Sequence, residues 1–419
     1  MNQERRTKDK EPGTRHEVPL RALDDLRVLD VTQFMAGPYC AMILADLGAD
    51  VVKIEPPAGD SARRMVGAVG TESPAFNAVN RGKRSLVLDL KLPDGRAVFK
   101  RLAGSADILI ENYRPRVMSS LGLGYAELAA ANPRLVYASI SGYGQTGPDR
   151  HKGGFDLIAQ GVSGIMSITG EPGRPPVKSG VPLTDLGAAL FALAGILAAL
   201  HYRSRTGHGQ YVDTSLVDAG VALSVWEATE YFSGLGVPAP MGSAHRMNGP
   251  YQAFRCADGY VTIGANTDRL FRGLCQVLGH AEWTEDPQFV DNAGRVRNRI
   301  RLGELIERVT VQQPRQHWLE ALDAHEIPCG PINDYSQVFA DRQILARELV
   351  GETDHPVLGR LRTLGSPLKL SETPTNPRRR APLLGEHSRM VLAEAGYNEE
   401  DIAALVTSGA VTVLNVDAS

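Results

Sequence analysis

The sequence predicts an α/β protein built on a doubly wound parallel sheet, with a second and smaller α+β domain. Two observations predict the sheet: short apolar, β-branched runs recur along the chain, and segments of helical character separate them. A third observation predicts the second domain, because a stretch rich in Gly and Pro near residues 233–250 interrupts this alternation.

The first β-α-β unit covers residues 26–54. The run LRVLDVT is typical of a buried strand, AGP breaks the chain, and YCAMILADLGA has helical character and ends at Gly48. The run DVVKIE is then a second strand. The loop after the first strand should lie at the carboxyl ends of the strands, where sheets of this kind bind ligands.

The same alternation continues along the chain. SLVLDLK (85–91) and ADILIEN (106–112) are predicted strands with a helix between them, and one or two helices precede the strand RLVYASISGYG (134–144). A long helix rich in small residues is predicted over 185–203, and TGHGQ ends it before a further strand and helix.

The second domain begins with a predicted β-hairpin. The stretch YQAFRCADGYVTIGA has a turn signal at Asp258 and Gly259, and helical segments follow it to about residue 325. We therefore expect a disordered tail (1–22), the first part of a large domain (23–225), a linker (226–247), a small α+β domain (248–335), and a linker with a return to the large domain (336–419).

Composition excludes several classes of protein. The net charge of -3 argues against nucleic acid as the main partner. The apolar stretch 186–200 is shorter than a membrane span and rich in Ala and Gly, which favours a buried helix of a soluble protein, and the charged N-terminus is unlike a secretory signal. Isolated cysteines, without CxxC spacing, predict neither a disulfide framework nor a zinc site and favour a reducing, cytoplasmic location; they are Cys40, Cys256, Cys275 and Cys329.

No fingerprint of a resident cofactor is present. The sequence lacks GxGxxG at the first helix, GxxxxGK[ST], HExxH and GxSxG, and its histidines show no metal-ligand spacing. We therefore expect no metal and no permanently bound cofactor, and a nicotinamide-dependent dehydrogenase is disfavoured.

Asp185 lies where a loop meets the long apolar helix. One interpretation is a helix N-cap, which is a common role for Asp at such a boundary. The other is a carboxylate nucleophile, because a helix N-terminus favours the ionised form that attack requires. The local sequence does not decide between them.

Polar and basic residues follow the predicted strands. Asn112, Tyr113 and Arg114 come directly after ADILIE, where amide, ring and guanidinium groups suit a nucleotide, although an ordinary structural role is equally compatible. Basic residues spread through 53–91 indicate either a solvated rim or a cradle for phosphates; they are Lys53, Arg81, Lys83, Arg84 and Lys91.

Several motifs in order make the chain resemble the family III CoA-transferases. The motifs are DVTQFMAGPYCAMILADLGADVVKIEPPAGD, RGKRSLVLDLK, ENYRPRVMSSLGLGYAEL, SISGYGQTGP and VPLTDLGAAL with TGHGQYVDTSL, and the resemblance extends to PLLGEHS. GSAHRMNGPYQAF and IPCGPIND are most similar to the branch that transfers CoA between dicarboxylates, such as succinyl-CoA–glutarate transferases.

The resemblance implies roles for particular residues. Asp185 in PLTD matches the family's nucleophilic aspartate. Matches to segments that contact CoA are Met35, Ala36, Leu88, Asp89, Leu90, Lys91, Asn112, Tyr113, Arg114, Ser141, Gly142, Tyr143 and Gly144. The chain departs from some members, which carry arginine in place of Pro56 and Ser120 and lysine in place of Ser141, and it has no glycine-rich lid at 242–250.

The resemblance also implies a fold and a reaction. The expected subunit is a ring with a Rossmann-like large domain, interlocked with a second ring in a homodimer. The expected reaction moves CoA from an acyl-CoA, with succinyl-CoA implied as donor, to a carboxylic acid through aspartyl intermediates. For a dicarboxylic partner, Arg246, next to His245, is the candidate cation for the second carboxylate, and a solvated arginine of the linker is the other interpretation.

Two other functions stay open from the sequence. An acyl-CoA racemase needs a paired base such as His with the Asp, and Phe155 stands before Asp156 where racemases carry that His. A non-catalytic acyl-CoA binding protein would share the binding residues and lack turnover.

Overall fold

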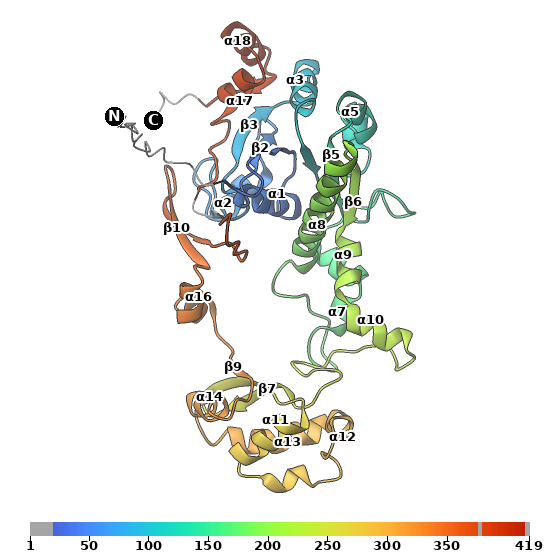
Figure 1. Ribbon diagram of the computed structural model, residues 1–419, viewed down its shortest axis with the longest axis vertical. Helices are drawn as coiled ribbons and strands as arrows, with labels where there is room; N and C mark the ends of the chain where they lie inside the picture. The colour runs from blue at the N-terminus through green and yellow to red at the C-terminus, as the bar shows by residue number, and fades with distance from the viewer. Residues whose placement is uncertain (1–19, 376–378, 415–419) are drawn as a thin grey trace, which may run out of the picture.

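The computed structural model describes residues 20–375 and 379–414. The greater part of the tail predicted for residues 1–22 therefore lies outside the described residues. The described chain forms two bodies, an upper one around a large sheet and a lower, smaller one (Figure 1).

A seven-stranded sheet forms the upper body, in the order β12-β3-β2-β1-β4-β5-β6. All neighbouring pairs are parallel except β12 with β3, which is antiparallel. The strands are β1 (Arg27–Asp30), β2 (Asp50–Glu55), β3 (Arg84–Leu88), β4 (Ile108–Glu111), β5 (Val136–Ser141), β6 (Tyr211–Ser215) and β12 (Val411–Thr412). The predicted parallel sheet is confirmed, with one addition: the chain returns at its C-terminal end to add the antiparallel edge strand.

The strand order reverses at β1. From β1 the chain adds β2 and β3 on one side, and then β4, β5 and β6 on the other. In open parallel sheets a ligand crevice lies outside the carboxyl ends of the strands at such a reversal. The segments that leave β1 and β4 therefore border the expected site.

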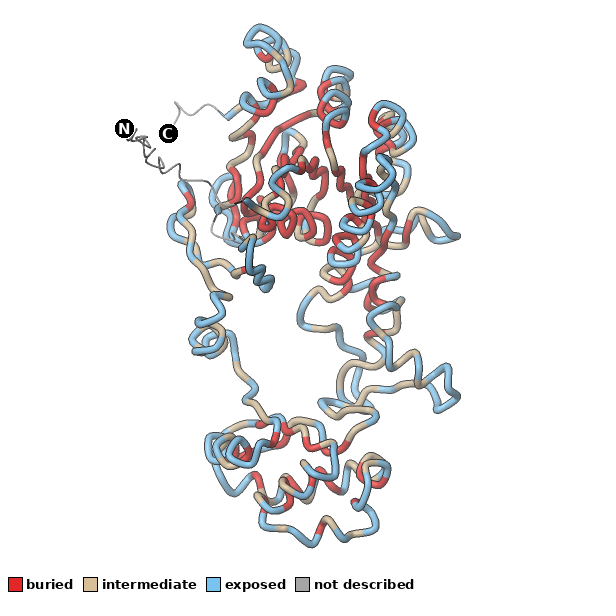
Figure 2. Tube along the Cα trace, in the orientation of Figure 1, coloured by how far each residue is buried: buried red, intermediate tan, exposed pale blue. Residues whose placement is uncertain are grey.

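Helices cover both faces of this sheet because successive strand residues point to opposite sides. Val28 packs in a core with helices of one face, and Leu29 packs in a core with helices of the other. On the first face lie α1 (Ala36–Asp46), α8 (Leu183–Thr206) and α9 (Leu216–Leu223); on the second lie α3 (Pro93–Ala103), α4 (Val117–Ser120), α5 (Tyr125–Ala131), α17 (Ser388–Glu394) and α18 (Glu399–Thr407). Figure 2 shows the buried residues concentrated in the strands and in the helices packed on them.

Helix α8 is the predicted long helix, and it ends at the left-handed Gly207. Of the helices described, it alone is long and apolar enough to cross a membrane by length and composition. Its alanine-rich side packs against α1, α9, β5 and β6, which identifies it as a helix of the core.

The lower body has its own core. It combines a three-stranded antiparallel sheet with helices around Phe254, Phe271 and Trp318. The elements are β7 (Tyr251–Cys256), β8 (Gly259–Gly264), β9 (Cys329–Pro331), α11 (Asp268–Val277), η2 (Ala281–Thr284), α12 (Asn292–Arg297), α13 (Arg299–Thr310) and α14 (Arg315–Asp323). The hairpin predicted at Asp258 and Gly259 is confirmed, because Cys256 pairs with Gly259 across it.

Two separate connections join the bodies (Figure 1). One contains α10 (Val225–Phe232) and then a stretch without regular structure; the other contains α15 (Tyr335–Val338), α16 (Arg342–Ala346) and the hairpin of β10 (Val350–His355) with β11 (Gly359–Leu364). The predicted linker 226–247 thus begins with a helix. The Gly- and Pro-rich part of the linker, which disfavours a helix, begins only at Gly234. Short helices complete the upper body: η1 (Ser61–Arg64), α2 (Pro74–Asn80), α6 (Asp156–Val162) and α7 (Ile165–Ile168).

Candidate active site

A cavity of about 610 Å³ lies at the strand-order reversal. The segments after β1, β4 and β5 line it, together with the start of α6 and the first turn of α8. It brings together eight residues that the sequence matched to the nucleophile or to CoA-contacting segments: Met35, Ala36, Asn112, Tyr113, Arg114, Ser141, Gly142 and Asp185. A cavity of this size falls in the range of small-molecule sites, about 300–1,000 Å³.

The other residues matched to CoA-contacting segments do not line this cavity. Leu88 is buried in the hydrophobic core, and the carboxylate of Asp89 accepts a hydrogen bond from the N–H of Lys91. Gly144 donates its N–H to the Ser141 hydroxyl and thereby shapes the turn after β5. The remaining two are Leu90 and Tyr143.

Asp185 is the third residue of α8, and Pro182 occupies the N-cap position. The interpretation of Asp185 as the helix N-cap was therefore wrong, because the helix begins earlier, at Leu183. The Asp185 carboxylate makes no hydrogen bond or ion pair with any residue that the structure describes, and it lines the cavity. Burial, together with the nearby negative charge of Asp156, raises the pKa of Asp185 to about 6.

Asp156 caps the start of α8 from another helix. Its Oδ1 accepts hydrogen bonds from the Thr184 backbone N–H at 3.0 Å and from the Thr184 hydroxyl at 2.8 Å. Its Oδ2 accepts a bond from Gln160 at 2.7 Å. Two carboxylates therefore share this end of the cavity, and Asp156 both fixes the first turn of α8 and raises the pKa of Asp185. Sequence reasoning considered Asp156 only for racemase chemistry and missed this role.

Two glycines bring Asp156 to this place. A Cβ atom on Gly154 would lie 2.6 Å from the Cα of Gly142, and a Cβ on Gly142 would lie 2.7 Å from the Cα of Gly154. Only glycine at both positions lets the segment before α6 press against the end of β5. This backbone contact sets where α6, and with it Asp156, begins.

Two cations line the cavity. Arg114 has no ion pair with any described residue, and its guanidinium packs over Gly153. Lys152 pairs with the exposed Asp149 at 3.0 Å. A guanidinium without a protein partner suits a phosphate group. Within residues 20–375 and 379–414, no cluster of three or more His, Cys, Asp or Glu side chains is placed to hold a metal ion.

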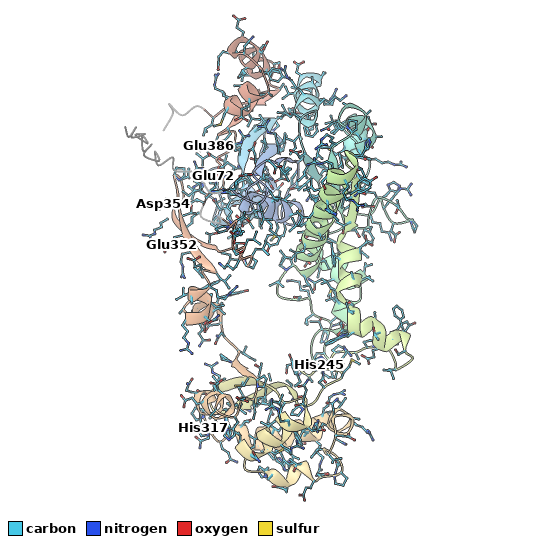
Figure 3. The ribbon with its side chains drawn as sticks, viewed as in Figure 1. Glu72, His245, His317, Glu352, Asp354 and Glu386 are labelled. Carbon is cyan, nitrogen blue, oxygen red and sulfur yellow. The ribbon has the colours of Figure 1, made fainter. Side chains whose placement is uncertain are left out.

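His245 and Arg246 lie away from this cavity. Figure 3 shows His245 beside the lower body, where the first connection reaches it. Both residues line a second, smaller cavity of about 200 Å³ with Trp226. Arg246 approaches Glu230 at 3.4 Å and Glu227 at 3.8 Å, so its charge is already compensated within the subunit.

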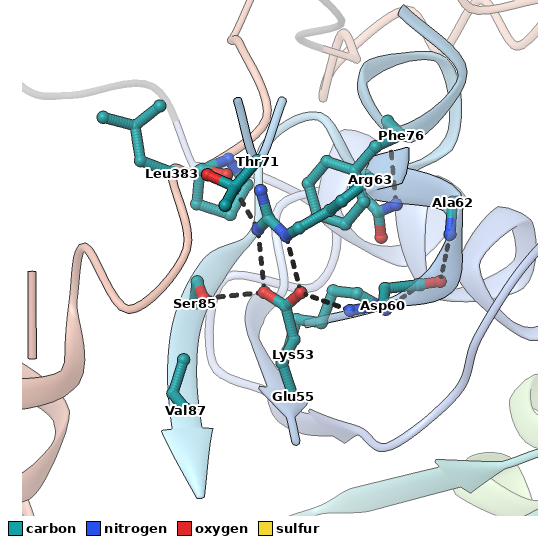
Figure 4. A network of polar contacts seen from close by, with 12 residues as sticks. Lys53, Glu55, Asp60, Ala62, Arg63, Thr71, Phe76, Ser85, Val87 and Leu383 are labelled. Atoms are coloured by element: carbon teal, nitrogen blue, oxygen red, sulfur yellow. Dashed lines mark hydrogen bonds and ion pairs between the residues drawn. The ribbon is translucent and has the colours of Figure 1, made fainter. Parts of the chain in front are cut away.

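Most of the basic residues singled out between 53 and 91 form neither a solvated rim nor a phosphate cradle. Lys53, Arg81 and Lys83 are buried and paired with carboxylates. Burial lowers the pKa of Lys83 to about 8. Arg84 pairs with Asp50 and Glu394, and among the five only Lys91 is exposed without an ion pair to a described residue. Both interpretations were wrong for the buried residues because their partners come from distant segments. Figure 4 shows part of this buried network, around Glu55 and Asp60.

Comparisons with known proteins show the family to which the chain belongs. Residues 23–388 match the family described as CoA-transferase family III. The chain is 39% identical to a succinyl-CoA:glutarate CoA-transferase of Mus musculus, with 94% of this chain and 91% of that protein aligned. It is 41% identical to a succinyl-CoA:mesaconate CoA-transferase of Haloarcula marismortui, over 90% of this chain and 97% of that protein.

A solved structure is similar as well. The fold superposes on a CaiB/BaiF family protein from Brucella suis with a TM-score of 0.79 and 38% identity, covering 90% of this chain and 99% of that one. The similarity thus concerns the fold of most of the chain.

Proposed function

This chain belongs to CoA-transferase family III, and from this premise we propose that it moves CoA from succinyl-CoA to a dicarboxylic acid with Asp185 as the acyl-accepting carboxylate. It is an enzyme that transfers CoA between an acyl-CoA and a carboxylic acid. The observation that carries the role of Asp185 is a half-buried carboxylate, unpaired with any described residue, in the cavity of about 610 Å³, with its pKa raised to about 6.

The proposed CoA site follows the cavity. Met35, Ala36, Ser141 and Gly142 would lie along the pantetheine, and the free guanidinium of Arg114 would take a phosphate. The nucleotide would then extend past Tyr113 toward the residues outside the cavity that match CoA-contacting segments, which are Leu88, Asp89, Leu90, Lys91, Tyr143 and Gly144. CoA and acyl-CoA are substrates here, and no resident cofactor is proposed.

The proposed reaction has two halves. An Asp185 carboxylate oxygen attacks the thioester carbonyl, the C–S bond breaks, and a mixed anhydride and CoA thiolate form. The thiolate then attacks the Asp185 carbonyl of the anhydride, which releases the first acid and leaves an aspartyl-CoA thioester. The acceptor carboxylate reverses both steps and regenerates Asp185.

Burial of Asp185 serves this chemistry. Each acyl intermediate reacts with water, so the mostly apolar lining of the cavity around Asp185 helps to protect the thioester energy. A carboxylate with few hydrogen bonds is also a stronger nucleophile than a fully hydrated one, and at a pKa of about 6 it is still mostly ionised at pH 7.

Phe155 argues against the racemase alternative. It lines the cavity at the position where racemases carry a His, and a phenyl ring cannot exchange a proton with the substrate. A non-catalytic binding protein would bind acyl-CoA without forming a new acyl-CoA thioester. The acceptor experiments below detect such a product.

The pH dependence of transfer should report Asp185. We expect kcat/KM to fall as pH decreases through about 6, because the anion is lost there, well above the usual range of an aspartate. In Asp156→Asn this acidic limb should move to lower pH, since a like charge is removed, while burial keeps it above the ordinary value of 3.8. Rate profiles of both proteins between pH 4.5 and about 8 check this, and an unmoved limb in Asp156→Asn would contradict the shared-charge explanation.

The acceptor is tested with a panel of acids. Succinyl-CoA incubated with glutarate, mesaconate, oxalate, acetate and formate should give new thioesters with the dicarboxylates. Exclusive use of monocarboxylates would overturn this part of the proposal.

The same panel tests Arg246 as the partner of the distal carboxylate. If that proposal holds, Arg246→Met lowers kcat/KM for dicarboxylates by about 10- to 100-fold, as expected for a charged hydrogen bond, and leaves the KM for succinyl-CoA unchanged. Arg246 already pairs with Glu227 and Glu230 in the subunit. If those pairs are its whole role, Arg246→Met retains full activity with dicarboxylates, and that result would contradict the proposal.

We also propose a cytoplasmic homodimer of interlocked ring-shaped subunits. Large apolar side chains stay exposed on α8 and α10 of the single chain, including Leu190, Phe191, Trp226 and Phe232, and monomers rarely leave such surfaces open. All four cysteines are free, as suits a reducing compartment. Light scattering should give twice the subunit mass, and a monomer at micromolar concentration would refute the assembly.

A further inference from the structure

The segment between β1 and α1 holds an unusual backbone conformation at the edge of the cavity. Phe34 has a φ of 65°, in the left-handed region that a residue with a bulky side chain rarely adopts. Gln33, Phe34, Met35 and Ala36 all line the cavity with Asp185. Such a conformation persists only where the surrounding structure holds it in place.

Asn112 holds the middle of this segment across the strand-order reversal. Its Oδ1 accepts the backbone N–H of Gln33 at 2.9 Å, and its Nδ2 donates to the backbone C=O of Gln33 at 2.8 Å. The side-chain amide thus pairs with both polar groups of one residue, as a neighbouring strand would. Beyond the ends of β1 and β4, the Asn112 side chain thus replaces the backbone hydrogen bonds that the two strands no longer make with each other.

Two buried charges hold the residues on either side of Gln33. Lys53 donates to the Thr32 C=O at 2.8 Å, and Asp60 accepts the Phe34 N–H at 3.3 Å. Lys53 and Asp60 pair with each other at 3.0 Å, which joins the two supports into one unit. Lys53, one of the basic residues for which the sequence left a solvated rim or a phosphate cradle open, therefore acts on this segment.

Two backbone N–H groups without a hydrogen-bond partner in the described chain follow Phe34 directly. The N–H groups of Met35 and Ala36 make no hydrogen bond to any described part of the chain, and both residues line the cavity. The tetrahedral intermediates of acyl transfer require donors of this kind, held where the negative charge develops. Their positions depend on how firmly Gln33 and Phe34 are fixed.

We propose that Asn112 is a positioning residue for acyl transfer, which holds residues 32–35, with Phe34 in its left-handed conformation, and so places the N–H groups of Met35 and Ala36 beside the reacting carbonyl. The proposal rests on the acyl transfer at Asp185 proposed above. It differs from a direct contact with CoA, because Asn112 already directs its Oδ1 and its Nδ2 to the Gln33 backbone.

The chain offers a matched control for this test. Asn132 makes the same kind of bond elsewhere in the upper body, since its Nδ2 donates to the carbonyls of Ala103 and Ala106 at 2.9 and 2.8 Å. Asn132 does not line the cavity. Asn112→Ala removes one donated and one accepted hydrogen bond to the backbone. Asn132→Ala removes two donated bonds and the one that its Oδ1 accepts from the Arg134 N–H at 3.2 Å, so a purely structural loss should be at least as large in Asn132→Ala.

The measurement combines steady-state kinetics with hydrogen exchange. With succinyl-CoA and glutarate, Asn112→Ala should lower kcat by about 10- to 100-fold and change the KM for succinyl-CoA by less than about threefold. Exchange of the peptide that covers residues 31–36 should accelerate about tenfold or more in Asn112→Ala. Asn132→Ala should show neither effect.

Several results would overturn the positioning role. They are an unchanged kcat, an equal fall of kcat in Asn132→Ala, or a loss that lies wholly in the KM for succinyl-CoA, which would make Asn112 a direct CoA contact. If wild-type enzyme transferred no CoA, the proposed function would fail by itself, and the exchange rates of residues 31–36 would still decide whether Asn112 holds the segment.

Discussion

Replacing Asp185 with asparagine is expected to abolish CoA transfer and, at the same time, to stabilise the folded protein at pH 7. Transfer should fall at least about 10⁴-fold, the scale seen when a covalent nucleophile is removed. An amide of the same shape cannot form the anhydride. Asp185→Ala should behave alike, which excludes slow deamidation of the asparagine as a source of residual activity.

The gain in stability follows from the sign of the pKa change. Burial raises the pKa of Asp185 in the folded protein to about 6 from the ordinary 3.8, so the folded state binds this proton more tightly than the unfolded chain does. As pH rises from about 4 to 6, the wild type should therefore lose about 2–3 kcal/mol relative to the variant, and the difference should stay constant above pH 6.

Urea unfolding of wild type and Asp185→Asn at pH 4, 5, 6 and 7 measures this difference. The two free energies of unfolding should nearly coincide at the lowest pH and separate upward. A folded variant that keeps near-normal turnover would remove Asp185 from the mechanism. A variant less stable than wild type at pH 7 would show that burial and the charge of Asp156 do not destabilise the ionised carboxylate of Asp185.

Arg63→Met should cause a large loss of stability. Arg63 is 1% exposed and donates to both oxygens of Glu55, at 2.7 and 2.8 Å, and to both oxygens of Glu72, at 2.8 and 2.9 Å. Its guanidinium also stacks over Phe76 (Figure 4). Removing it leaves two buried carboxylates without a cation, which costs about 3–5 kcal/mol.

An exposed arginine provides the comparison. Arg360 pairs with Glu352 on the surface of the β10–β11 hairpin, where the arginine side chain is 73% exposed. Such a pair contributes about 0–1 kcal/mol, so Arg360→Met should unfold close to the wild-type urea concentration. Equal midpoints for Arg63→Met and Arg360→Met at pH 7 would contradict the buried network as a source of stability.

The parallel sheet was accessible to sequence reasoning because apolar β-branched runs alternate with helical segments. The edge strand β12 was not, since its two residues, Val411 and Thr412, are β-branched but form too short a strand to be recognised from the sequence. They become a strand only because β3 offers an open edge.

The burial of the charged residues could not be predicted from the sequence, for a different reason. Lys53 lies within the run DVVKIE and Lys83 just before the run SLVL, and in sequence neither can be told from an exposed basic residue. Their burial depends on Asp30 and Asp60, which other segments bring to them. Asp156 likewise reaches Asp185 only through the contact between Gly142 and Gly154, and no spacing along the chain encodes that approach.

The covalent state of Asp185 during turnover tests the central claim most directly. Wild-type enzyme is incubated with succinyl-CoA and no acceptor, quenched in acid, digested, and analysed by mass spectrometry. The account predicts a CoA adduct on the peptide that contains Asp185, which is discharged by glutarate and is absent from Asp185→Asn. An adduct on another residue, or transfer that proceeds with Asp185 unmodified throughout, would contradict it.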